Sequence, residues 1–344
     1  MQKRVLFMII VTCWAVTVQA QLFMENVSKA GTKAATFLEI PVGARAVGMG
    51  SAFVSVASDA TALYWNVAGI AKLERYELVG IHSRWIADTS FDYAGLIIPL
   101  SGYGTLGISF TSLSMDDMIV RTVEKPEGTG EYFSAGDINI GISYAFRLTD
   151  RFALGITTKY IQQKIWHMTA SAFAVDLGTT FRTDLFNGLV IGASITNFGT
   201  SLQLQGRDTR QFTPVDKTKL GSNQNIPENI EMDSWELPLL FQFGVSANAI
   251  QNETYRWTVA VDALHPSDNY ESLNVGTELA YQEFLFLRGG YNAFGLKYGE
   301  GGMSLGLGFT TSTLFSNIIL KIDYAYRDMK RLNDTQFFSV ALEF

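Results

Sequence analysis

Charged residues are scarce in this chain. Asp, Glu, Lys and Arg make up 17% of its 344 residues, whereas a soluble globular domain carries about 25%. The single cysteine, Cys13, excludes a disulfide-stabilised scaffold. A net charge of -7 without a basic stripe argues against nucleic-acid binding. The 47% of hydrophobic residues excludes intrinsic disorder. Beyond residue 20 no apolar run reaches the roughly 18 residues of a membrane-spanning helix.

The first twenty residues have the pattern of a signal peptide. Lys3 and Arg4 precede an apolar stretch over residues 5–18, and a small residue, Ala20, stands at the expected cleavage point. About 20 apolar residues are needed to span a bilayer, so an uncleaved anchor is the weaker alternative. Residues 1–20 are therefore predicted to be removed on export. The mature chain then lacks cysteine, and its net charge falls from -7 to -9.

From residue 76 onward, apolar and polar residues alternate with period two. In residues 137–146, for example, Ile138, Ile140 and Ile142 share one face while Asn139 and Ser143 share the other. This alternation predicts strands with one apolar face. Fourteen such runs are found, at 76–84, 90–99, 103–112, 133–146, 151–163, 170–182, 187–197, 237–249, 255–264, 270–281, 284–292, 302–310, 314–328 and 335–344.

Three features favour a membrane barrel over a soluble sandwich. The second face of each strand is small and polar, as in a barrel lumen, and strands of about ten residues match a tilted membrane span. The connections also alternate between short turns and longer loops, the longest of which are residues 113–132 and 198–236. Bacterial outer-membrane barrels show this pattern, with short turns in the periplasm. The predicted fold is a 14-stranded antiparallel outer-membrane β-barrel over residues 76–344.

The C-terminal run adds a further indication. Its apolar face consists of Phe338, Val340, Leu342 and Phe344. This pattern resembles the terminal strand that the barrel-assembly machinery recognises. Aromatic residues near strand ends are expected to form the interfacial girdles of the barrel; they are Tyr76, Trp85, Tyr93, Trp166, Trp257 and Tyr326.

Residues 21–75 do not alternate and are predicted to form a small helical plug inside the barrel. Residues 37–53 are rich in small side chains, which let backbone segments pack closely. Residues 59–66 are expected to form a short helix with Ser58 or Asp59 as its N-cap. Arg45, placed among small residues, is expected to find a carboxylate or carbonyl groups and to lock the plug.

Two motifs in the plug, within residues 43–50 and 59–69, resemble the signature of the PorV/PorQ family of outer-membrane proteins. That family is grouped with the FadL-like 14-stranded barrels. The residues that carry the resemblance are Gly43, Arg45, Gly48, Met49, Gly50, Asp59, Tyr64, Trp65, Asn66 and Gly69. One departure is visible, because Val67 stands where the family usually has proline.

The resemblance implies two different activities. PorV-type barrels belong to the type IX secretion system, where they associate with the translocon, bind the C-terminal domains of cargo proteins and hand them over at the cell surface. FadL-type barrels admit hydrophobic small molecules, so such a molecule, or a detergent, would lie in the lumen. A third hypothesis is a structural barrel within a larger envelope complex. The expected partners are outer-membrane lipid with translocon and cargo proteins, but no nucleic acid.

The long segment 198–236 is the candidate partner-binding loop. It carries apolar residues in a polar context, namely Phe212, Ile226, Met232 and Trp235. Exposed apolar anchors suit contact with a protein, and a lid folded over the barrel mouth is the alternative. The pairs Lys159/Asp176 and Lys321/Asp323 are expected to bond within the lumen.

The remaining polar residues do not predict chemistry. His82, His167 and His265 are far apart in the sequence and have no companion ligands at the spacing of a metal site. No nucleophile lies in the pattern of a catalytic set. Neither a cofactor, a metal nor an enzymatic activity is therefore expected.

Overall fold

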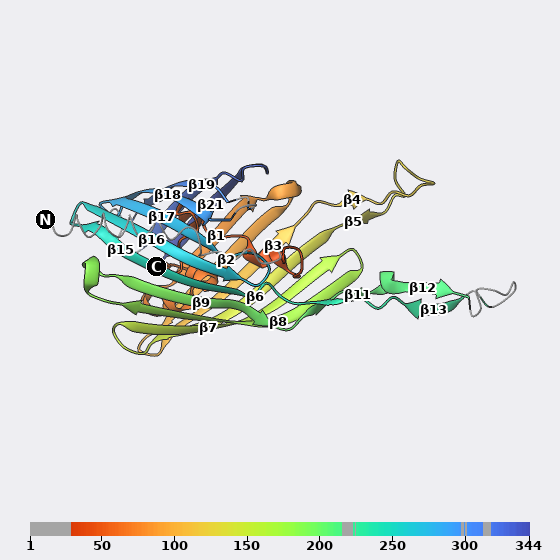
Figure 1. Cartoon of the computed structure of the whole chain (residues 1–344), viewed down its shortest axis with the longest axis horizontal. Helices are drawn as coiled ribbons and strands as arrows, with labels where there is room; N and C mark the ends of the chain where they lie inside the picture. The colour runs from red at the N-terminus through yellow and green to blue at the C-terminus, as the bar shows by residue number, and fades with distance from the viewer. Residues whose placement is uncertain (1–28, 215–222, 224, 297–298, 300, 312–317) are drawn as a thin grey trace.

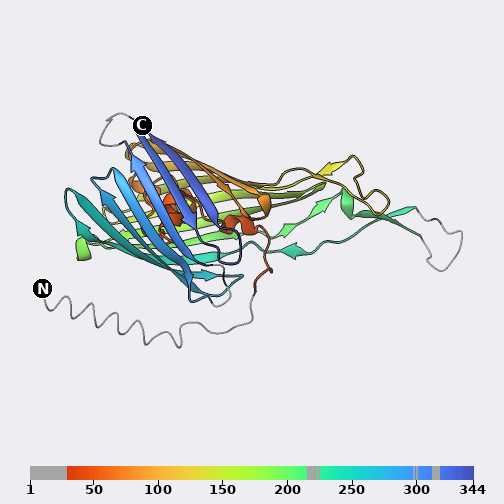
Figure 2. The same ribbon diagram turned by 90° about the horizontal axis from the view of Figure 1, so that it is seen from above.

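The computed structural model describes residues 29–214, 223, 225–296, 299, 301–311 and 318–344. The predicted signal peptide lies outside the described residues. Figures 1 and 2 show a barrel with short helices inside it and two hairpins that project from one end.

The barrel wall is a single closed antiparallel sheet. Fifteen strands are joined in it, of which β11 (Gln205–Gly206) only extends the edge of β8, leaving fourteen in the wall. They are β1 (Glu77–Arg84), β2 (Ser90–Leu100), β3 (Gly104–Ser114), β6 (Ala135–Arg147), β7 (Phe152–Ile165), β8 (Met168–Arg182), β9 (Val190–Gly199), β15 (Leu240–Gln251), β16 (Tyr255–Pro266), β17 (Ser272–Tyr281), β18 (Leu285–Phe294), β19 (Met303–Thr310), β20 (Ile319–Arg327) and β21 (Thr335–Glu343). The last strand, β21, pairs with β1 and closes the ring. The predicted fold class is confirmed.

The wall has the predicted polarity. On β6, Ile140 and Ile142 are exposed on the outer surface, whereas Asn139 and Ser143 are buried in the lumen. Phe338, Val340 and Leu342 of β21, and Phe344 just after it, are all exposed on the outer face, where lipid would surround them. The assembly role proposed for these four residues remains a prediction.

The alternation is broken where β1 and β2 meet the plug. Val79, Ile81, Phe91 and Tyr93 point inward and are at most 4% exposed. They pack against the apolar core formed by the plug, so this part of the lumen wall is hydrophobic. The expectation that Tyr93 belongs to an interfacial girdle is therefore wrong. Trp85 also packs inward, edge-on to buried Phe337.

In its described residues, the plug has four short helices before the first strand: η2 (Thr36–Glu39), α2 (Ala44–Gly48), α3 (Ala62–Trp65) and η3 (Val67–Lys72). Helix α2 contacts β18 to β21, and η3 contacts the opposite wall at β3 and β6 to β8. Among the described residues, no helix is long and apolar enough to cross a membrane. The predicted helix over residues 59–66 is shorter than expected, because α3 spans only Ala62–Trp65. Its N-cap is Thr61, so the expectation of Ser58 or Asp59 as the N-cap is wrong; the Asp59 side chain instead accepts from the Thr61 amide in the turn before the helix.

The two ends of the barrel differ. At one end, neighbouring strands are joined by short turns such as residues 101–103 and 252–254, and a short helix, η5 (Leu185–Asn187), lies in a third connection. At the other end, η4 (Ile86–Asp88) joins β1 to β2, and two long segments project outward (Figures 1 and 2). By the rule for bacterial outer-membrane barrels, the short turns mark the periplasmic end.

The projecting segments are built from short strands. The first is the hairpin β4 (Met118–Ile119) and β5 (Tyr132–Phe133). The second, which we call the outer arm, spans residues 202–235. Its elements are β10 (Leu202–Gln203), β11, η6 (Arg207–Thr209), β12 (Arg210–Thr213), β13 (Ile226–Asn229) and β14 (Ser234–Trp235).

Candidate functional site: the plug lock and the outer arm

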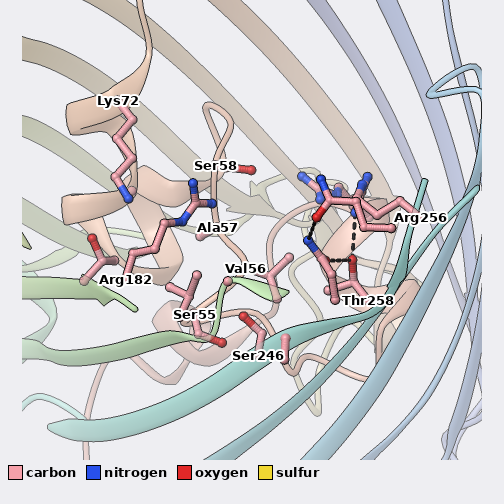
Figure 3. A pocket seen from close by; sticks show the side chains of 17 residues that line it. Ser55, Val56, Ala57, Ser58, Lys72, Arg182, Ser246, Arg256 and Thr258 are labelled. Carbon is pink, nitrogen blue, oxygen red and sulfur yellow. Dashed lines mark hydrogen bonds between the residues drawn. The ribbon is translucent and has the colours of Figure 1, made fainter. Parts of the chain in front are cut away.

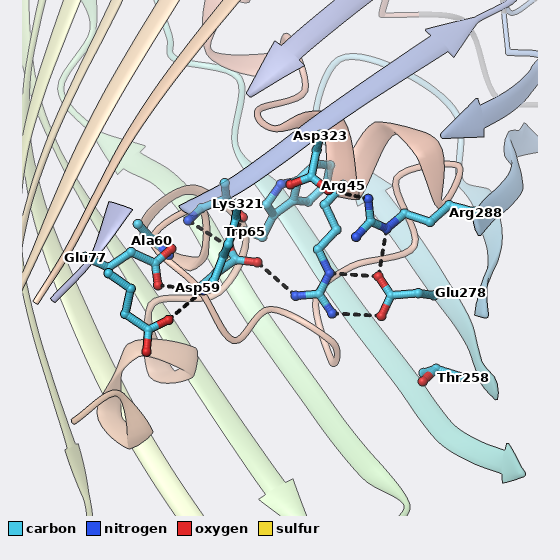
Figure 4. A network of polar contacts seen from close by, with 12 residues as sticks. Arg45, Asp59, Ala60, Trp65, Glu77, Thr258, Glu278, Arg288, Lys321 and Asp323 are labelled. Atoms are coloured by element: carbon cyan, nitrogen blue, oxygen red, sulfur yellow. Dashed lines mark hydrogen bonds and ion pairs between the residues drawn. The ribbon is translucent and has the colours of Figure 1, made fainter. Parts of the chain in front are cut away.

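Arg45 of α2 is the centre of a charged network between the plug and the wall (Figure 4). Its Nη1 donates to Oδ2 of Asp59 within the plug at 2.9 Å. Its Nε and Nη2 donate to the two carboxylate oxygens of Glu278 on β17, at 2.9 and 3.1 Å. This paired geometry is the strongest form of an arginine–carboxylate contact. Arg45 therefore ties α2 both to the rest of the plug and to the wall.

The network extends along the inner face of the barrel wall. Glu278 is 0% exposed at its side chain and also accepts from Arg256 at 3.1 Å and Arg288 at 2.7 Å. Arg288 in turn contacts Asp323 at 2.5 Å. Because every buried charge has an opposite partner, the desolvation cost of burying these groups is offset. We call Arg45, Asp59, Glu278, Arg256, Arg288 and Asp323 the plug lock.

The electrostatics of the plug residues follow from these contacts. Burial opposes ionisation of Asp59, but the charge of Arg45 and the Thr61 hydroxyl outweigh it and lower the pKa of the carboxyl. Burial likewise opposes the charge on Arg45, and Glu278 and Asp59 more than compensate, so its pKa is raised. Both groups are held in their charged forms.

Sequence reasoning identified one lumen pair and mispaired the other. Lys159 and Asp176 do meet, at 2.6 Å, on the neighbouring strands β7 and β8. Lys321 instead contacts Glu77 at 3.3 Å and Glu343 at 3.0 Å. Lys321 and Asp323 lie two residues apart on one strand, whereas side chains on adjacent strands approach more closely.

The glycines of the first motif lie directly against the wall. Gly50 has a φ of +63°, and a Cβ there would be 2.4 Å from the backbone nitrogen of Tyr291 on β18. A Cβ on Gly48 would be 3.0 Å from the Cα of Gly306 on β19. Met49 between them is fully buried. The small residues therefore allow backbone-to-backbone packing between plug and barrel.

The second motif fastens the plug to the opposite wall. Asn66, 1% exposed, donates through Nδ2 to the carbonyls of Val54 and of Thr179 on β8, both at 2.9 Å. Trp65 donates from Nε1 to the carbonyl of Val42 at 2.8 Å, and Tyr64 donates to the carbonyl of Leu38 at 3.2 Å.

The remaining motif residues complete the plug. Gly69 lies in η3 where a Cβ would be 2.3 Å from the Ala57 carbonyl oxygen, and Gly43 precedes α2. The ten motif residues are thus brought together inside the barrel.

The outer arm carries the apolar residues singled out in the long loop. Phe212 on β12 is 66% exposed, Trp235 on β14 is 47% exposed and Ile226 on β13 is 36% exposed. Met232 lies at the base of the arm, where its carbonyl accepts from Gln203 at 2.6 Å. The β12–β13 hairpin points away from the barrel (Figures 1 and 2), so its described part is not a lid over the mouth.

The base of the outer arm is joined to the start of the plug. Leu202 and Leu237 are buried in the plug core. The Ala34 amide donates to the carbonyl of Glu236 at 2.9 Å, and Lys33 forms an ion pair with the Glu236 side chain. The arm therefore grows out of a base that is packed against the plug.

The cavity beside the plug lock has a mixed lining, in which charged side chains stand next to apolar ones such as Val79, Phe286 and Phe309. This cavity of about 280 Å³ is lined by side chains of both charges, including Arg45, Glu77, Arg288 and Lys321. Among the described residues, no group of three or more His, Cys, Asp or Glu residues is placed to hold a metal ion. His167 and His265 each face one carboxylate, at 3.1 and 3.0 Å.

A closed fourteen-stranded barrel with an apolar exterior and an internal plug defines an outer-membrane barrel protein. The family model described as "Type IX secretion system protein PorV" matches residues 23–229. The chain belongs to this family. Its fold and family support an outer-membrane location.

The chain is similar in fold to a solved hydrocarbon channel and a solved toluene transporter. The structure titled "CymD monoaromatic hydrocarbon channel" is 10% identical, covers 88% of this chain and 97% of its own, and has a TM-score of 0.55. The Pseudomonas putida toluene transporter TodX is 12% identical, with the same coverage and a TM-score of 0.53. At these identities the likeness establishes the fold alone. No curated protein matches the chain.

Proposed function

We propose that this barrel is a component of a type IX protein secretion system and binds the translocon, the C-terminal domains of exported cargo, or both, before handover at the cell surface. Membership of the PorV family supports the secretion assignment. The single structural observation behind the binding role is the outer arm, which exposes Phe212 and Trp235 in a projecting hairpin segment. Large exposed aromatics of this kind are typical anchors of protein–protein interfaces.

The lumen supports a binding protein over a conduit. A channel for hydrophobic molecules needs an apolar path, and ligand sites for such molecules are lined mainly by apolar side chains. Here the plug lock places paired charges in the lumen, and the adjacent cavity carries Arg45, Glu77, Arg288 and Lys321 beside its apolar lining residues. Passage of an apolar molecule would require these charges to lose their partners.

Transport of hydrophobic molecules is the second candidate. It is favoured by the shared fold with the monoaromatic hydrocarbon channels. A purely structural barrel in an envelope complex is the third. The proposal includes a signal peptide over residues 1–20, because an exported barrel needs a cleaved leader. It also includes the plug over residues 21–75.

The test is a mild-detergent pull-down of the tagged protein from its native outer membrane, with mass spectrometry of proteins and of lipophilic molecules. Wild type should recover a large translocon barrel or cargo sharing a C-terminal domain, and a Phe212→Ser/Trp235→Ser variant should lose it. Phe186→Ser is the matched control, because Phe186 is 70% exposed but lies at the short-turn end.

Each outcome of that pull-down distinguishes the candidates. Recovery of the barrel alone with a bound apolar compound would support transport. If the Phe186→Ser control lost its partner proteins as the arm variant did, the outer arm could not be assigned as the binding surface. Recovery of an envelope complex, with secretion intact in the arm variant, would support the structural role.

A further inference from the structure

A cavity of about 310 Å³ lies beneath the plug near the short-turn end of the barrel (Figure 3). We call it the basal cavity. Four cationic side chains line it: Arg45, Lys72, Arg182 and Arg256. Among the described residues that line it, none is Asp or Glu. The wall of the basal cavity is therefore positive.

Two of the four cations are already neutralised. Arg45 is held by Asp59 and Glu278, and Arg256 is held by Glu278 and by Glu283 at 2.6 Å. Lys72 and Arg182 have no side-chain ion pair with any carboxylate in the described part of the chain. Figure 3 shows both side chains on the same side of the cavity. The excess positive charge is thus concentrated at one place.

The Lys72 site is unfavourable without a counter-ion. Lys72 ends η3, and burial together with the nearby charges of Arg182 and Arg147 lowers the pKa of its ammonium group. Lys72 is partly buried, so less water screens it from these like charges, whereas Arg182 itself is exposed to solvent. A bound anion would relieve both effects.

Buried hydroxyl groups line the same cavity. Ser55 of the plug and Thr180 of β8 are each 5% exposed. Neither hydroxyl oxygen has a hydrogen-bond partner among the described residues. Buried polar groups are rarely left unpaired in folded proteins. Both oxygens are enclosed by neighbouring atoms, so a small side-chain movement would have to present them to a ligand in the cavity. Cations and hydroxyl donors around one space are the donor set of an oxyanion site.

We propose that the basal cavity binds a phosphate group that enters from the short-turn end of the barrel. A phosphate monoester carries a charge of roughly -1.5 to -2 near neutral pH and accepts hydrogen bonds on several oxygens. That charge matches Lys72 and Arg182, and the oxygens suit Ser55 and Thr180. Its source is either a soluble phosphate ester or the headgroup of a phospholipid. The proposal does not depend on the secretion role, because the outer arm is at the opposite end.

The first test is titration calorimetry on the full-length protein in a neutral detergent, with inorganic phosphate and glycerol 3-phosphate as probes. Wild type should bind at least one probe saturably, and more weakly as sodium chloride is raised. Lys72→Gln and Arg182→Gln should each weaken binding by roughly 10- to 100-fold, the loss expected for a hydrogen bond to a charged group. Arg151→Gln is the matched control, because Arg151 is exposed and paired with Asp184 at the same rim.

A second variant separates binding from folding. Thr180→Val keeps the shape of the side chain and removes an unpaired buried hydroxyl. It should weaken phosphate binding without lowering the melting temperature of the ligand-free protein, because no existing hydrogen bond is lost. A purely structural role of this hydroxyl predicts the opposite, a lower melting temperature and unchanged binding.

Native mass spectrometry identifies the source of the phosphate group. A phosphatidylglycerol molecule retained by wild type and lost from Lys72→Gln would assign a lipid headgroup. Calorimetric binding without retained lipid would assign a soluble ester. The proposal would be overturned if neither probe bound and no lipid were retained. It would also be overturned if the Lys72→Gln and Arg182→Gln variants bound as tightly as wild type.

Discussion

Neutralising Glu278 should loosen the plug while leaving the barrel closed. The Glu278→Gln substitution keeps the shape of the side chain but removes the charge that accepts four hydrogen bonds from Arg45, Arg256 and Arg288. Removing one partner of a buried ionic network costs about 3–5 kcal/mol. Each arginine keeps one other carboxylate, so we expect the lower value, about 3 kcal/mol.

The assay is hydrogen exchange of plug amides, read by mass spectrometry in detergent. Since about 1.4 kcal/mol corresponds to a factor of ten, a loss of about 3 kcal/mol should raise the exchange of α2 amides roughly 100-fold. Glu283→Gln is the control, because that carboxylate also binds Arg256 but is 55% exposed. Its effect should stay below about 1 kcal/mol. Plug exchange that is unchanged within about threefold in Glu278→Gln would refute the lock.

Three further substitutions test the plug. Burial and the neighbouring Asp268 raise the pKa of Glu39 to about 8, above its unfolded value of about 4.3. The folded state therefore retains a proton that the unfolded state loses, so stability should fall as pH rises from about 4.5 to about 8. Glu39→Gln should flatten that slope in pH-dependent thermal melts, and an unchanged slope would contradict the assignment. Gly50→Ala should destabilise the plug by at least about 2 kcal/mol, because the added Cβ would meet the β18 backbone. The measurement is limited proteolysis, in which residues 29–72 should be cleaved faster than in wild type. Val67→Pro should leave the melting temperature unchanged or raise it slightly. Proline suits this position because Val67 is the first residue of η3 and the preceding Asn66 has an extended backbone, with φ -161° and ψ 99°. A clear drop in melting temperature would show that the turn depends on valine.

The strands were predictable because the surroundings of the wall impose a simple rule. Lipid outside and a polar lumen inside force every second side chain to be apolar, and the run at 137–146 obeys this. The rule fails at Ile81 and Tyr93, whose inner surroundings are the plug rather than water. Alternation reports the polarity of the two faces and does not reveal what fills the lumen.

The contacts of the candidate site were less predictable. Arg45 was expected to find a carboxylate, but its partner Glu278 is 233 residues away. That contact depends on where α2 is placed along the inner wall, which local patterns do not encode. Lys72 and Arg182 gave no sequence signal, because each is one cation among many until η3 and β8 bring them together. Charged residues at inward positions of strands, such as Arg288, were the sequence signal that could have indicated a charged network inside the barrel.

The closure of the ring by β1 and β21 bears on the order of folding. The plug precedes the first wall strand, yet the Ala44 amide donates to Ser339 of the last strand, 295 residues later, at 2.8 Å. The ring cannot shut until β21 arrives, and after that the plug is enclosed on all sides by continuous backbone pairing. We therefore expect the helices to dock before or as β1 pairs with β21. Because contacts so distant in sequence form late, docking of α2 and sealing of the wall are expected to be one concerted final event.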